Sequence, residues 1–226
     1  MATPVLYRAI WIPSAVLLAG MVTLYSVQPE AIPSVGESKT FTTEDRSITV
    51  EHPANWKPRQ LSMNSVLTQV EFEPSRSVHI VIKSDLQGSL MADMSKAAAS
   101  TGSGMTDAQG NLLPGMEQRE QKQKTPLEKL HAAQGAAMET EYAERHYEEG
   151  ETKPTKVGSV EALTTDFTFE ESGLFGKKQM AGKRVTALGG ERRLTIIATC
   201  PKEAVSSIGK AFDSIIESVE MGQPGG

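Results

Sequence analysis

The sequence predicts an α+β fold, in which an antiparallel sheet is covered by helices and preceded by one N-terminal transmembrane helix. Two pairs of short runs alternate apolar and polar residues. Each pair predicts an antiparallel hairpin, because every second side chain of a strand points to the same face. The chain then closes with a helical pattern whose apolar residues recur at three- and four-residue spacing. This order of strands and helices is expected to form one domain.

One uncharged run, residues 9–27, is long enough to cross a bilayer. As a helix it would span roughly 28 Å, close to the hydrocarbon thickness of about 30 Å. Tyr7 and Trp11 lie at one end and Tyr25 at the other, where aromatic rings are expected at the membrane interfaces. No clear cleavage site follows the run, so we expect an uncleaved signal anchor, with a cleaved signal peptide as the alternative.

The charges beside this run predict its orientation. Arg8 is the only charged residue before it and Glu30 is the first after it, a weak positive-inside bias that leaves the N-terminus in the cytoplasm. The protein is therefore expected in the inner membrane, with its C-terminal domain in the periplasm. In order, the expected parts are a cytoplasmic N-terminus (1–8), the span (9–27), a tether (28–39), the domain (40–221) with a long exposed loop (100–125), and a flexible tail (222–226).

Several elements are predicted within the domain. The strands are joined by turns at residues 73–76 and at Gly189-Gly190, the second being a good signal for a two-residue hairpin. Pro126 stands at the first position of the longest helical segment, and Pro201 begins the closing helix. The predicted strands are residues 47–51, 66–72, 78–82, 160–170, 182–188 and 191–200, and the predicted helices are residues 86–99, 127–149 and 201–219.

The composition is that of an ordinary globular domain. Hydrophobic residues make up 38%, charged residues 23%, and the formal net charge is -5. A mildly acidic balance argues against a nucleic-acid-binding domain, which would usually be basic. Cys200 is the only cysteine, so no intrachain disulfide can form. It ends an alternating apolar run, which favours a buried thiol over a reactive one.

No cofactor site and no catalytic or metal-binding group can be assigned. His131 and His146 fall on one predicted helix fifteen residues apart, about 22 Å by rise alone, so they cannot share a metal. His146 has feasible helical spacing to Glu149 or Tyr142, but one helix face supplies too few ligands. We expect a non-enzymatic protein without a cofactor.

Two segments resemble a known family. Residues 47–50 form a strand that runs into His52-Pro53-Ala54-Asn55-Trp56, and the strand 194–200 passes through Pro201 into a helix that contains residues 212–219. Both are similar to segments of the PsbP-like and Mog-type group, which includes the bacterial DcrB-like proteins. This resemblance implies an α-β-α sandwich and a non-enzymatic role as an accessory subunit, binding module or chaperone. It assigns no functional residue, because fold does not decide function.

Basic residues are concentrated between residues 174 and 194, on two neighbouring predicted strands and their turns, where only Glu191 opposes them. We expect them to dock on an acidic protein partner or on anionic lipid headgroups, the alternative being a solvated face. The predicted partner-binding residues are Lys177, Lys178, Lys183, Arg184, Arg192 and Arg193.

Two functional hypotheses remain. In the first, the protein is a single-pass accessory subunit whose periplasmic domain docks on a larger membrane protein complex, which could be photosynthetic by analogy with PsbP. In the second, it is a free, membrane-tethered module that binds an exported client or a small ligand. Small residues in the span, such as Ala15 and Ala19, would allow close helix packing in a complex.

Overall fold

The computed structural model describes residues 35–63, 66–86, 124–173 and 176–222. The predicted span with Tyr7, Trp11 and Tyr25 lies outside these residues, as does most of the predicted helix 86–99 and loop 100–125. In the part that is described, no helix combines the length and the apolar character that a membrane span requires.

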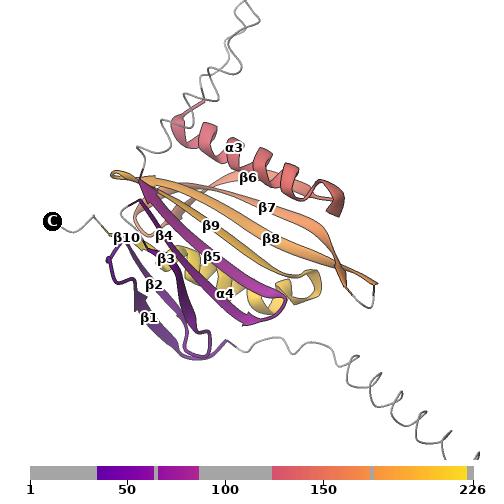
Figure 1. Ribbon diagram of the computed structural model, residues 1–226, viewed down its shortest axis with the longest axis horizontal. Coiled ribbons are helices and arrows are strands. Elements are labelled where there is room, and N and C mark those ends of the chain that lie inside the picture. Colours follow the sequence, from indigo (N-terminus) through magenta and orange to yellow (C-terminus); the bar gives the residue numbers. More distant parts are fainter. Residues whose placement is uncertain (1–34, 64–65, 87–123, 174–175, 223–226) are drawn as a thin grey trace, which may run out of the picture. The chain divides into compact units, whose positions relative to one another are not determined.

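Seven antiparallel strands form the main sheet, in the order β3-β4-β5-β9-β8-β7-β6 (Figure 1). Hairpins join β4 to β5 and β8 to β9, as the alternating runs predict. Residues 190–191 make the two-residue turn after β8, one position later than expected, and Gly190 there has a φ of 57°. The strands are β3 (Pro58–Met63), β4 (Leu67–Ser75), β5 (Val78–Leu86), β6 (Glu148–Val157), β7 (Val160–Gly173), β8 (Gly176–Gly189) and β9 (Arg192–Pro201).

A smaller three-stranded sheet lies beside the closing helix. It consists of β1 (Ser38–Thr42), β2 (Ile48–Pro53) and β10 (Glu220–Met221), in the order β1-β2-β10. β1 includes the last two residues of the expected tether, and β2 includes His52 and Pro53, which were predicted to form a turn.

Within the described residues, two α-helices lie on opposite faces of the seven-stranded sheet (Figure 1). α4 (Val205–Ser218) packs with β2 and β9 over the main apolar core, which contains Trp56, Ile196 and Phe212. α3 (Pro126–Glu141) packs on β7 and β8 on the other side. Short 3₁₀ turns follow α3 (η1, Ala143–Arg145) and precede α4 (η2, Lys202–Ala204). The α+β class with an antiparallel sheet between helices is therefore confirmed.

The predicted helix 127–149 is wrong in its second half. α3 ends at Glu141, and β6 begins at Glu148. Between them, His146 has left-handed backbone angles (φ 50°, ψ 52°), which no α-helix can contain. Helix-forming residue types suggested a continuous helix, but pairing with β7 converts the polar segment after the turn into an edge strand.

Candidate functional site

The six predicted partner-binding cations are engaged within the chain. Lys177 Nζ lies 2.7 Å from Glu170 Oε2, and Lys178 Nζ donates to Ser77 Oγ at 3.1 Å. Lys183 binds Asp213 of α4. Arg193 Nε donates to Asp85 Oδ1 at 2.7 Å.

The remaining two cations, Arg184 and Arg192, are buried. Arg184 is 1% exposed and its Nη2 lies 2.7 Å from Glu149 Oε1, whereas Arg192 is 5% exposed and donates to Ser84 Oγ at 3.3 Å. Strand alternation turns Arg184 towards α3, where its Nη1 donates to the His131 carbonyl oxygen, whereas Arg192 is buried beside Ser84 of the neighbouring strand. The six residues therefore do not form one exposed basic face, and a docking role for them stays a prediction.

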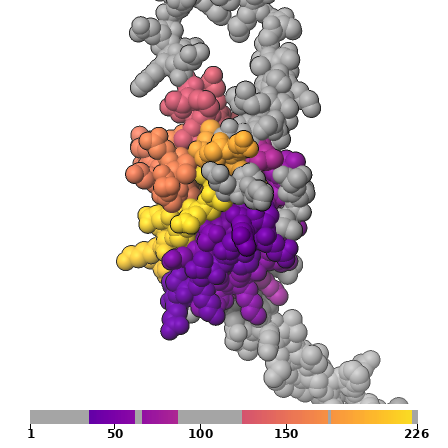
Figure 2. Space-filling view, turned by 90° about the vertical axis from the view of Figure 1, so that its left-hand side faces the viewer, coloured from indigo at the N-terminus to yellow at the C-terminus, as the bar shows by residue number. Residues whose placement is uncertain are grey.

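A groove of about 860 Å³ lies between α4 and the strands β6, β7 and β8. One wall consists of η2 and α4, with Lys202, Ser206 and Lys210, and the other of β6 and β7, with Glu148 and Asp166. Figure 2 shows the surface on one side of the domain, where C-terminal residues in yellow lie between the N-terminal strands in indigo and the orange strands. The groove is the best candidate for a binding site, because large hollows with a few polar groups are where ligands and partner segments bind.

The floor of the groove consists of apolar side chains and one ion pair. Ala181, Cys200 and Phe212 contribute apolar surface, while Lys183 and Asp213 form an ion pair that crosses from β8 to α4. Burial raises the pKa of the Cys200 thiol to about 11, so the group is protonated and unreactive at neutral pH. This agrees with the expected structural role of Cys200.

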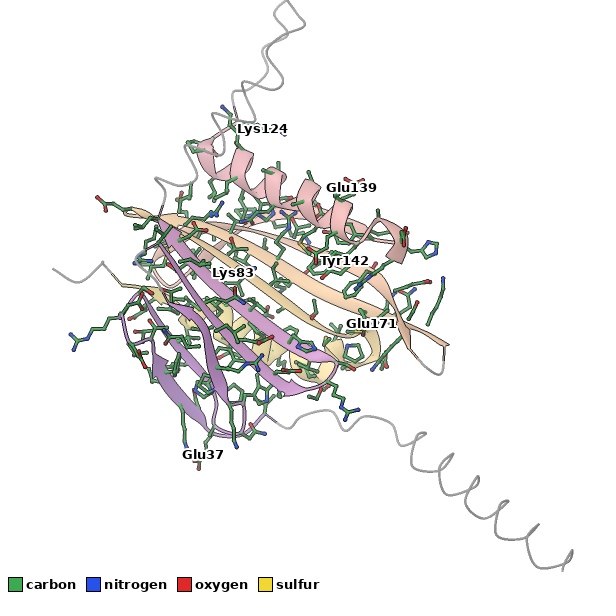
Figure 3. All side chains as sticks on the ribbon, viewed as in Figure 1. Glu37, Lys83, Lys124, Glu139, Tyr142 and Glu171 are labelled. Carbon is green, nitrogen blue, oxygen red and sulfur yellow. The ribbon has the colours of Figure 1, made fainter. Side chains whose placement is uncertain are left out.

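A smaller hollow of about 370 Å³ lies on the opposite face, at the end of α3. The Tyr142 and Phe169 rings pack in a tilted arrangement, with centroids 4.8 Å apart, and the Arg145 guanidinium carbon lies 5.2 Å from the Tyr142 ring centroid. Figure 3 shows Tyr142, Lys83 and Glu171 on this side, from three different elements. Aromatic and methionine side chains surrounded by charges are typical of interaction surfaces.

Beneath α3 lies a buried polar network centred on His131. Its Nδ1 is 2.8 Å from Thr186 Oγ1 and its Nε2 is 2.8 Å from Thr165 Oγ1. Thr186 donates its only hydroxyl hydrogen to Gln134 Oε1, so it must accept from His131 Nδ1–H. Nε2 is then the acceptor for the Thr165 hydroxyl. Burial and the neighbouring Arg184 lower the pKa of His131 to about 4, so the ring is neutral at pH 7.

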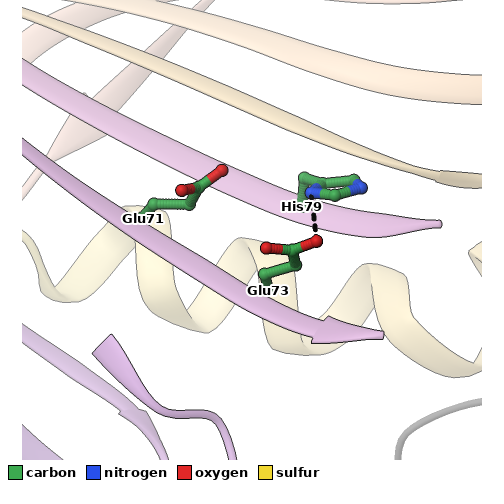
Figure 4. A group of neighbouring side chains, drawn as sticks. All are labelled: Glu71, Glu73 and His79. Carbon is green, nitrogen blue, oxygen red and sulfur yellow. Dashed lines mark ion pairs between the residues drawn. The ribbon is translucent and has the colours of Figure 1, made fainter. Parts of the chain in front are cut away.

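Two carboxylates and a histidine near the β4–β5 turn have the side-chain types of a divalent-metal site (Figure 4). The ligand atoms of Glu71, Glu73 and His79 all lie within 4.8 Å of one another. However, Glu71 already binds Arg59 at 2.8 Å, and His79 Nδ1 is 4.0 Å from Glu73 Oε1. Glu71 is thus held by Arg59, and His79 Nε2 lies 2.7 Å from the Arg76 carbonyl oxygen, so we assign no metal to this group.

The other histidines have structural contacts. His146 faces Glu170, with Nε2 3.7 Å from Oε2, while Glu149 binds Arg184 and Tyr147. The mixed site of His146 with Glu149 is therefore not assembled. His52 is buried, where its Nδ1 lies 2.9 Å from the Pro53 carbonyl oxygen.

The charged walls of the groove were not predicted from the sequence. Lys202, Ser206 and Lys210 recur every four residues, a spacing that places them on one face of a helix and that could have been noticed. Glu148 and Asp166 could not be paired with them in advance, because their position depends on β6, which was predicted to be helical.

Comparison with known proteins supports the fold. No protein-family model matches the chain, and no curated protein matches it in sequence. Among solved structures, the chain is similar to the cyanobacterial PsbP protein CyanoP from Synechocystis, with 8% identity, 87% of this chain and 99% of that chain covered, and a TM-score of 0.50. The chain has a PsbP-like fold. At this identity the likeness carries no information about activity or partners.

Two further structures match less well. One is the Ran-binding protein Mog1p from Saccharomyces cerevisiae, with 10% identity, 82% of this chain and 96% of that chain covered, and a TM-score of 0.45. The other is LpqN of Mycobacterium tuberculosis, with 11% identity, 83% and 91% covered, and a TM-score of 0.39.

Proposed function

We propose that this protein is a non-enzymatic accessory subunit, held in the inner membrane by residues 9–27, whose periplasmic domain docks on a larger membrane protein complex. A photosynthetic complex is one candidate, by the fold shared with CyanoP. The tether is short, so the domain would act close to the membrane surface.

The groove beside α4 is the observation that carries this proposal. It is large, open to the surface, and has charged side chains on both walls above a partly apolar floor. Lys202 and Lys210 are exposed, and no ion pair within the described residues engages them. Val205 adds an apolar side chain that is 43% exposed at the same place. Such a surface offers both charge complementarity and apolar contact to a protein partner.

The hollow at the end of α3 favours a second candidate, a free membrane-tethered module that binds a client or a small ligand. Its volume of about 370 Å³ and its lining, in which Tyr142 and Phe169 lie among charged side chains, suit a small ligand that carries both apolar and polar groups. In that case the protein would need no stable partner, and the span would serve only for location.

Extraction of the native protein in mild detergent distinguishes the two candidates. The accessory subunit should migrate with a stoichiometric partner, which mass spectrometry would identify together with the state of the N-terminus. Migration as a monomer would contradict the proposal and leave the free module.

Variants then test the docking surface. Replacing Lys202 and Lys210 by Gln should reduce the amount of partner recovered and its sensitivity to salt. The control replaces Lys39 and Lys129 by Gln, two exposed lysines on β1 and α3 away from the groove, and should change neither. A third variant, Lys177→Gln with Lys178→Gln, tests whether the basic residues predicted from the sequence contribute to binding of the partner.

A further inference from the structure

The groove beside α4 has opposite charges on its two walls. Lys202 and Lys210 lie on the side of α4, and Glu148 and Asp166 lie on the side of β6 and β7. All four residues are exposed, and none of them forms an ion pair with another described residue. By contrast, the Lys183 and Asp213 side chains that lie between the walls neutralise each other.

The opposite charges of the two walls favour a bound segment with a particular charge pattern. A segment in the groove would meet positive charge on one side and negative charge on the other. In an extended strand that lies flat, successive side chains point to opposite sides, so alternating acidic and basic residues would face the two walls correctly. A uniformly acidic segment would place part of its charge against Glu148 and Asp166, which costs binding energy.

The spacing of charges along the α4 wall matches the spacing of side chains in an extended strand. Lys202 in η2 and Lys210 in α4 are eight positions apart, about 13 Å at the rise of a 3₁₀ turn that continues into an α-helix. Four residues of an extended strand cover about 13 Å, so its first and fifth side chains would reach the two lysines. Ser206, midway along the wall, would face the third. The second and fourth side chains would point to the wall that carries Glu148 and Asp166.

We infer that the groove binds an extended segment of a partner protein in which acidic residues at the first and fifth positions alternate with basic residues at the second and fourth. This inference rests on the proposed docking function and specifies the chemistry of the partner. Ionic contacts determine which edge of the segment faces each wall, and the apolar floor with Ala181 and Phe212 accommodates its backbone and the aliphatic parts of its side chains.

Peptide binding to the full-length protein in detergent tests the inference. The probe is a fluorescent peptide containing Glu-Lys-Gln-Lys-Glu, and the control contains the same residues in the order Glu-Glu-Gln-Lys-Lys. We expect the alternating peptide to bind at least about fivefold more tightly, since exposed ion pairs each contribute up to about a factor of five. Equal affinity for the two peptides would overturn the inference.

A charge exchange between the walls provides a second test. The variant with Lys202→Glu, Lys210→Glu, Glu148→Lys and Asp166→Lys should prefer the reversed peptide Lys-Glu-Gln-Glu-Lys over the original. The variant with Lys39→Glu and Lys129→Glu should keep the original preference, and circular dichroism confirms that both variants are folded. If the exchanged variant bound both peptides equally, instead of preferring Lys-Glu-Gln-Glu-Lys, the assignment of a positive and a negative wall would be contradicted.

The outcomes separate this inference from the proposed function. A protein that is extracted as a monomer but selects the alternating peptide would refute the stable subunit and support the groove chemistry. A protein extracted with a partner that does not select between the peptides would support the subunit and refute this description of the groove.

Discussion

The two helices are held on one sheet by different physical means. α4 buries five residues, all of them apolar: Ile208, Ala211, Phe212, Ile215 and Ile216. α3 buries four residues, of which only Leu130 and Met138 are large and apolar. Beneath the middle of α3 lie the hydrogen bonds of His131 and Gln134 with Thr186. The ion pair between Arg184 and Glu149 lies beside them, and only the C-terminal end of α3 adds an apolar cluster, in which Met138 packs with Phe167, Phe169 and Met180.

This difference has consequences for stability and specificity. Apolar burial is non-directional and stabilises α4 in proportion to its area. A buried polar network contributes less net free energy, but each broken partner leaves a costly unsatisfied group, so α3 is held in one register. Gly135 shows the close fit, because a Cβ at this position would lie 2.8 Å from Arg184 Nη2. α4 should therefore support the fold globally, and α3 should respond to changes in its polar contacts.

The largest expected effect is the loss of apolar packing under α4. Ile215 is 1% exposed, and Ile215→Ala should lower the free energy of unfolding by about 4 kcal/mol, because it removes buried methyl groups and leaves a cavity. Urea denaturation of the full chain followed by circular dichroism measures this change. The matched variant Leu130→Ala in α3 should cost less. Equal losses at the two positions would contradict the comparison.

Acidification should affect α3 selectively. The folded pKa of His131 is lowered to about 4, below the unfolded value of about 6.5, so the unfolded chain binds the proton first. The contribution of neutral His131 to the free energy of unfolding is fully present above pH 6.5. It is lost as the pH falls towards 4, by about 3 kcal/mol in total. Burial raises the pKa of Asp45, but the hydrogen bonds that it accepts from Thr68, Thr43 and Ser47 together outweigh this effect and lower the pKa to about 2. The contribution of Asp45 to stability is therefore complete above pH 3.8 and is lost only in a lower pH window.

Amide hydrogen exchange of residues 126–141 between pH 7 and 4 measures this effect, after correction for the intrinsic exchange rate. His131→Gln should remove the pH dependence from α3, whereas His146→Ala, at an exposed histidine, should leave it unchanged. A pH dependence that survives in His131→Gln would assign the effect to other groups.

The contrast between the helices also explains how much of the fold could be predicted. The apolar spacing of α4 and the alternation of β4, β5 and β9 are properties of short segments, so the sequence shows them directly. The network of α3 joins residues 34 to 55 positions apart, and its threonines, histidine and arginine follow no period. Arg184 illustrates the difficulty, because its charge suggested an exposed docking residue while strand alternation places it under α3.

The candidate groove was less predictable than the fold for a related reason. β6 is polar along nearly its whole length, since an edge strand with both faces exposed needs no alternation. Without β6, Glu148 could not be placed opposite α4. The lysines of the other wall were visible in the sequence, but their significance depends on the opposing carboxylates.

The smallest effect is expected at the N-terminus of α3. Thr125 accepts from Glu128 N–H at 3.2 Å, and Glu128 Oε2 accepts from Thr125 N–H at 2.6 Å, a reciprocal capping box. Thr125→Ala should destabilise α3 by about 1 kcal/mol, seen as about fivefold faster exchange of its amides with little change in global unfolding. Thr140→Ala in the same helix removes only a hydroxyl bonded to the Ala136 carbonyl oxygen and should be nearly neutral. If Thr125→Ala lowered global stability as much as Ile215→Ala, α3 and α4 would unfold as one unit and the local character of α3 would be refuted.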